Sequence, residues 1–216
     1  RQLSVEPAAC LAIEDSLNSR VVIVTLDLST VPRWLRDAVE RQVGERYGLA
    51  PGSILLNASH THSGPSLSGA AVTFMGGPQV DPEYVKRADA YGKMVEERIV
   101  RIVGEALSRC GPATLLYTHA RAGFAMNRRL LNGYVYQNSP NPEGPVDHDV
   151  PVLRVTASDG SLKAILFGYA CHNTTSGEDT FHGDYAGFAQ AALEATYPGT
   201  VALFMLYPPS WLILLA

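Results

Sequence analysis

Two histidines separated by one residue stand in the segment SHTHSGP, residues 59–65. Alternate side chains of an extended segment point to the same side, so His60 and His62 are expected to share one site. Imidazole nitrogen binds zinc at about 2.0–2.1 Å, and a catalytic zinc takes about three protein ligands and a water. The pair is therefore a candidate for part of a zinc site. The alternative is a pair of hydrogen-bonded loop histidines, which is the more frequent meaning of an isolated HxH.

A third histidine, His172, follows an apolar run and precedes a polar turn (CHNTT, 171–175). A metal site requires His172 to converge with His60; the alternative is a histidine that bonds backbone groups. The neighbouring Cys171 invites interpretation as a thiol nucleophile, but a cysteine that ends an apolar strand is usually buried and inert. His182 is a further candidate ligand, whereas Asp184 stands where an N-cap is expected.

The cluster NRR at 127–129 is the other polar group of interest. Arginine keeps its charge and presents a fixed fork of donors, which suits a substrate carbonyl or a developing oxyanion. Arg128 is a candidate for this role, and the interpretation of Arg128 as a solvated surface residue is equally favoured. For Arg129 the surface interpretation is favoured. His119 and His148 are interpreted as structural or exposed.

Composition sets the limits within which these residues act. The chain has 216 residues, of which 46% are apolar and 18% charged, which favours one large domain with a sizeable core. A net charge of -4 gives no electrostatic reason to expect nucleic acid as a partner. Cys10, Cys110 and Cys171 are odd in number and lack CxxC spacing, so they predict no complete disulfide framework.

Hydrophobic periodicity predicts alternating strands and helices, and both histidine segments directly follow predicted strands. The fold class expected is α/β, a layered domain with a mixed β-sheet flanked by helices. Strands are expected at 20–27, 53–59, 113–119, 150–156, 162–170 and 200–205, helices at 32–48, 81–111 and 184–196, and loops at 63–78 and 121–148.

The two ends of the chain are unusual. The first residue is Arg1, with no leader-like apolar stretch after it. Residues 201–216 are strongly apolar, but Pro208 and Pro209 interrupt them, and a bilayer crossing needs roughly 20 apolar residues. We therefore expect no transmembrane span. The chain is interpreted as a partial catalytic domain over 1–205 followed by an aberrant or truncated apolar tail at 206–216.

Four segments occur in an order that resembles the N-terminal catalytic domain of the neutral/alkaline non-lysosomal ceramidases. They are SHTHSGP (59–65), NR (127–128), CHNT (171–174) and GDYAG (183–187), and the resemblance runs from about residue 12 to residue 205. The first segment is highly specific, and the other three are individually modest.

The resemblance implies a zinc-dependent amidase that cleaves the N-acyl bond of ceramide-like lipids and works outside the cytoplasm or as a secreted protein. Contact with a membrane surface is a further possibility for such a protein. The resemblance also implies that His60 and His172 bind the zinc ion. His62 matches a histidine that handles protons beside the metal-bound water, and Arg128 matches an arginine that holds the reacting carbonyl.

The family's continuation after 201–205 carries a serine-bearing loop and then a glutamate and a tyrosine that complete the zinc shell, and residues 206–216 do not resemble it. The chain is therefore expected to bind zinc weakly and to be inactive by itself. Two alternatives stay open: a hydrolase of the same fold acting on a non-lipid amide or ester, and a non-catalytic domain with structural histidines.

Overall fold

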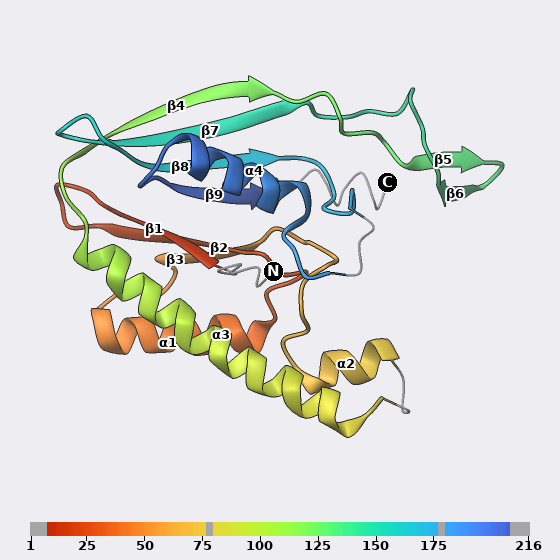
Figure 1. The fold of residues 1–216 in the computed structure, drawn as a ribbon, viewed down its shortest axis with the longest axis horizontal. Coiled ribbons are helices and arrows are strands. Elements are labelled where there is room, and N and C mark those ends of the chain that lie inside the picture. Colours follow the sequence, from red (N-terminus) through yellow and green to blue (C-terminus); the bar gives the residue numbers. More distant parts are fainter. Residues whose placement is uncertain (1–7, 77–79, 177–179, 208–216) are drawn as a thin grey trace. The chain divides into compact units, whose positions relative to one another are not determined.

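The computed structural model describes residues 8–76, 80–176 and 180–207 of the chain. They form two compact units (Figure 1). Of these residues, the first unit contains 8–76, 80–111 and 180–183, and the second contains 112–176 and 184–207. Each unit has a mixed sheet with helical cover, which confirms the predicted α/β class.

The sheet of the first unit has the order β1-β2-β3. Its strands are β1 (Ala8–Glu14), β2 (Arg20–Leu26) and β3 (Ile54–Ala58). β1 runs antiparallel to β2, and β2 runs parallel to β3. The strands expected at 20–27 and 53–59 are confirmed. β1 was not predicted, because its sequence AACLAIE is rich in small residues that favour strands only weakly.

Helices α1 (Arg33–Tyr47) and α3 (Pro82–Ser108) run along the same face of this sheet (Figure 1). Gly48 caps the end of α1, and its left-handed φ of 66° costs a glycine little. Asp81 caps the start of α3, and its carboxylate accepts a hydrogen bond from the Glu83 N–H at 2.8 Å. Between the helices and the strands lies a core of fully buried aliphatic side chains, which includes Val22, Val24, Leu26, Leu35, Val39, Ile99 and Val103.

The expected loop at 63–78 contains a helix, so that prediction is wrong for α2 (Gly69–Gly76). The sequence GAAVTFMG offers no apolar periodicity, which is why a loop was expected. The signal present is local: the Ser68 hydroxyl accepts a hydrogen bond from the Ala71 N–H at 3.2 Å, as an N-cap does.

The sheet of the second unit has the order β4-β7-β8-β9. Its strands are β4 (Ala113–Arg121), β7 (Asp149–Ala157), β8 (Leu162–Tyr169) and β9 (Val201–Leu206). The first three are antiparallel neighbours, whereas β8 and β9 are parallel and are joined through α4 (Asp184–Thr196). A parallel pair needs such a crossover. All five elements were predicted.

Residues 121–148, expected as one loop, contain a hairpin of β5 (Arg129–Asn132) and β6 (Val135–Asn138), so the loop prediction is wrong there. The strands are short and lie among glycine, asparagine and proline residues, which hid them. The predicted tail at 206–216 is described only for Leu206 and Tyr207, since residues 208–216 lie outside the described part of the chain. Among the helices that the structure describes, none has the length and apolarity needed to cross a membrane.

Gly92 of α3 provides a test of how the first unit is packed. A Cβ at this position would lie 2.0 Å from the Leu67 carbonyl oxygen, so Gly92→Ala is expected to destabilise the chain by about 1–3 kcal/mol. Gly44 is the matched control in α1, where an added Cβ would lie 3.4 Å from its nearest neighbour, the Leu49 carbonyl oxygen.

Gly44→Ala should be neutral or stabilising by up to about 1 kcal/mol, because alanine favours a helix interior. Urea denaturation of both variants measures the difference. Equal stabilities for the two variants would contradict the close approach of α3 to the segment after SHTHSGP.

Candidate metal centre

The segment that carries His60 continues the pairing of β2 with β3 beyond the ends of both strands. The Ser59 N–H donates to the Leu26 carbonyl at 2.8 Å, and the His60 N–H donates to the Leu28 carbonyl at 3.0 Å. His60 itself has a left-handed φ of 64°. The expectation of an extended segment through the two histidines is therefore wrong. A non-glycine residue rarely adopts this conformation, and such outliers gather at functional sites.

The backbone of the neighbouring segment fixes the His60 ring. Its Nδ1 lies 2.5 Å from the Ser29 carbonyl oxygen. A carbonyl only accepts hydrogen bonds, so Nδ1 carries the proton and Nε2 keeps the lone pair that a metal requires. The His60 and His62 rings meet edge to face, with centroids 5.0 Å apart and planes at 86°. His60 is half-buried and His62 is exposed.

Thr61, between the two histidines, is fully buried and anchors the loop. Its hydroxyl donates to the His182 carbonyl at 2.9 Å and accepts from the Ser63 N–H at 3.1 Å. The His182 N–H in turn donates to the Ser63 carbonyl at 3.1 Å. His182 is not a member of the histidine group described below. From the sequence, His182 was a candidate ligand. In the structure, its backbone N–H and carbonyl hold the SHTHSGP loop in place.

In the second unit, Asp184 holds the turn that carries His172. Its carboxylate accepts hydrogen bonds from the Thr175 N–H at 3.1 Å, the Thr175 hydroxyl at 2.6 Å and the Ser176 N–H at 2.9 Å. It also accepts one from the Tyr185 N–H at 2.7 Å. Asp184 is buried and has a left-handed φ of 55°. Asp184 stands at the helix start as expected, and its carboxylate also binds the turn that precedes the helix.

Two further contacts join this turn to the start of α4. The Asn173 Oδ1 accepts from the Ala186 N–H at 3.4 Å. The Tyr185 hydroxyl donates to the Cys171 carbonyl at 2.6 Å. Burial, and then the charge of Asp184, raises the pKa of the Cys171 thiol to about 11. A protonated thiol is a poor nucleophile, which favours the inert interpretation of Cys171.

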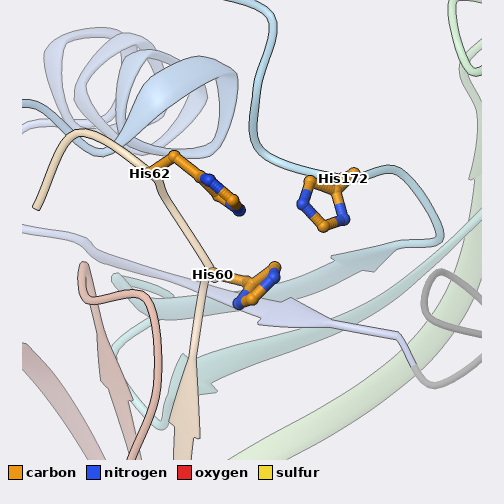
Figure 2. A group of neighbouring side chains, drawn as sticks. All are labelled: His60, His62 and His172. Atoms are coloured by element: carbon orange, nitrogen blue, oxygen red, sulfur yellow. The ribbon is translucent and has the colours of Figure 1, made fainter. Parts of the chain in front are cut away.

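His60, His62 and His172 form a group that could hold a metal ion, each offering one ring nitrogen. Figure 2 labels the three side chains: His60 and His62 extend from the segment after β3, and His172 extends from the segment after β8. Three imidazoles suit zinc and equally several other divalent transition metals. The three histidines therefore fit the predicted zinc, but they do not distinguish zinc from these other metals.

The remaining candidates lie in the second unit. Arg128 is exposed, and its Nε donates to the Asn138 Oδ1 at 2.9 Å, which fixes the guanidinium at the base of the β5–β6 hairpin. The roles of Arg128 and His62 in catalysis stay predictions. His119 is exposed and pairs with Asp149 at 2.7 Å, and His148 Nε2 contacts the Ala125 carbonyl at 3.3 Å. Both have the surroundings expected of structural histidines.

Two solved structures share this fold over 92% of the chain. One is a ceramidase complexed with C2, with a TM-score of 0.71 and 23% sequence identity. The other is the neutral ceramidase from Pseudomonas aeruginosa, with a TM-score of 0.70 and 23% identity. The chain spans 31% of the first structure's length and 32% of the second's. Identity at this level shows the fold alone, and at that level the predicted resemblance to ceramidases is confirmed.

No family model matches the sequence, and no curated protein matches it either.

Asp184 yields a prediction about pH. Burial opposes its charge, but the hydrogen bonds from Thr175, Ser176 and Tyr185 outweigh burial and hold the pKa of this carboxyl below its ordinary value. A lowered pKa means that the stabilisation is fully present above the unfolded pKa of about 3.9 and is lost as the pH falls through the folded pKa. Asp184→Asn should therefore lower the free energy of unfolding by about 1–3 kcal/mol at neutral pH. Because the variant has no carboxyl to titrate at this position, its stability should fall less than that of the wild type between neutral and acidic pH.

Thermal unfolding of the variant and the wild type between neutral and acidic pH measures this effect. Asp159→Asn is the control, because the pKa of this exposed turn carboxyl is also lowered, by hydrogen bonds from Ser161, without holding a second segment. If both variants lose the same small amount of stability, Asp184 does not hold the His172 turn.

Proposed function

We propose that this chain forms part of a zinc-dependent amidase that hydrolyses the N-acyl bond of ceramide-like lipids. The observation that carries the proposal is the group of His60, His62 and His172 on a fold shared with ceramidases. His60 is held by the backbone pairing that continues past β3, and Asp184 holds the turn that carries His172.

The residues present fit a zinc ion. His60 and His172 are proposed as ligands, and the Ser29 carbonyl orients the His60 ring so that Nε2 is the ligating atom. When bound, zinc lowers the pKa of a coordinated water toward about 7 and polarises a carbonyl. His62 belongs to the same histidine group and is exposed, so it is able to exchange protons with substrate or solvent beside the metal.

Arg128 is proposed to hold the oxygen of the scissile amide. The hydrogen bond from the Arg128 Nε to Asn138 restrains the guanidinium. It leaves the two terminal nitrogens of Arg128 to donate to a substrate. A donor placed in advance of the reaction stabilises developing negative charge more than a mobile one, because it needs no reorganisation.

We expect zinc to bind the isolated 216-residue chain weakly, with affinity that depends on the proposed ligands. His60→Ala or His172→Ala should lower zinc affinity by at least about 10-fold, since even residues that only orient a zinc ligand change affinity by about 10- to 100-fold. His119→Ala is the matched control, because this exposed histidine is paired with Asp149 and is not in the group. Competition of the chain against a chromophoric zinc chelator measures the affinities.

Equal affinities for all three variants and the wild type would remove the metal from the proposal. A loss in His60→Ala but not in His172→Ala would restrict the metal to the HxH segment.

The isolated chain is also expected not to hydrolyse ceramide, because it spans 31% of the ceramidase it resembles. Incubation with ceramide and with short N-acyl amides in zinc-containing buffer, followed by detection of the released fatty acid, checks this. Tight zinc retention with measurable amidase activity would contradict the expected inactivity. Release from the short amides alone would favour the non-lipid alternative.

A further inference from the structure

We propose that the tip of the β5–β6 hairpin is a lipid-binding element that enters the interfacial region of a bilayer. This hairpin tip comprises Leu130, Leu131, Tyr134, Val135 and Tyr136. The choice of lipid as the binding partner rests on the proposed function. That the hairpin tip is an interaction surface follows from the exposure, register and charge of its residues.

The hairpin tip is apolar and exposed. Tyr134 is 103% exposed, Val135 65%, Tyr136 56% and Leu131 54%, and Leu130 adds a fifth large apolar side chain at 38%. Figure 1 shows the hairpin beyond the ends of β4 and β7, away from the four-stranded sheet of its own unit. Contiguous exposed apolar side chains of this kind mark interaction surfaces.

The hairpin presents apolar side chains on both faces. Leu131 is paired with Tyr136, and Asn132 is paired with Val135. Side chains alternate across a strand, so Leu131 and Tyr136 lie on one face, and Leu130 and Val135 lie on the other. A protein partner packed on a two-stranded hairpin covers one face, whereas lipid surrounds both. The arrangement therefore favours insertion of the tip into lipid.

The charge of the surrounding segment agrees with an anionic surface. Residues 113–142 contain Arg121, Arg128 and Arg129 and no aspartate or glutamate, although the whole chain has a net charge of -4. Arg128 and Arg129 stand directly before the tip. Basic residues next to an inserting apolar element attract anionic headgroups, by about 1 kcal/mol each. Tyrosine is also enriched where a membrane meets water.

The base of the hairpin is held firmly. The Asn127 side chain is buried and donates to the Pro145 carbonyl at 3.0 Å, while its oxygen accepts from the Arg129 N–H at 2.9 Å. Asn141 donates through Nδ2 to the Arg129 carbonyl at 3.0 Å. At the other end, Gly133 has a φ of 64°, as the first turn residue of a type II′ hairpin requires. An isolated hairpin is marginally stable, so these contacts present the apolar tip in a defined conformation.

Cosedimentation of the whole chain with vesicles tests the proposal. The vesicles contain phosphatidylcholine alone or with phosphatidylglycerol, and no ceramide, so the result is independent of zinc binding and hydrolysis. Binding is expected to be stronger with phosphatidylglycerol and to weaken with added salt. The double variant Y134S/V135S should reduce partitioning by about 10-fold on both vesicle types. Arg129→Gln should reduce it by about fivefold on the anionic vesicles only.

Leu17→Ser is the matched control, because Leu17 is an 81% exposed apolar residue in a turn of the first unit. It should bind vesicles like the wild type. Circular dichroism checks that every variant is folded. The proposal is overturned by absence of vesicle binding, by an equal loss in the control, or by a double variant that loses self-association in sedimentation velocity while keeping vesicle binding.

Discussion

The candidate site depends on the backbone pairing that continues past the ends of β2 and β3. The carbonyls of Leu26 and Leu28 accept hydrogen bonds from the N–H groups of Ser59 and His60, so the backbone is restrained at the end of the strand. His60 has a left-handed conformation there. The next carbonyl along, that of Ser29, then fixes which ring nitrogen carries the proton. A buried aliphatic core stabilises the strands themselves, so the geometry of the ring is set by the packing of the first unit.

Much of the fold was predictable from the sequence, because most of its elements carry strong local signals. β2 and β8 are β-branched or aliphatic runs, and α3 has both a capping aspartate and apolar periodicity. The elements that were missed lack such signals. Three of the seven residues of β1 are alanine, α2 has only eight residues, and β5 and β6 have four each. Their formation depends on partners that the sequence does not identify, such as β2 for β1.

The histidines of the candidate site were predictable from residue types and motif order, but the residues that hold them were not. Thr61 and the His182 backbone lie far apart in the chain, and only the fold brings them together. Asp184 was recognised as a helix-start residue, yet its carboxylate binds the turn after His172. In both places a hydrogen bond between two separate segments restrains a histidine-bearing loop. Sequence motifs identify the groups that do chemistry more readily than the groups that position them.

X-ray absorption at the zinc edge of the zinc-loaded chain tests the proposed metal centre most directly, because it reports the ligands themselves. A zinc site built on His60 and His172 predicts nitrogen ligands at about 2.0–2.1 Å with the scattering pattern of imidazole. It also predicts that His60→Ala and His172→Ala each lower the imidazole contribution, while His119→Ala leaves it unchanged. A shell of oxygen ligands only, or an imidazole signal that neither ligand variant alters, would contradict a zinc site at these two histidines.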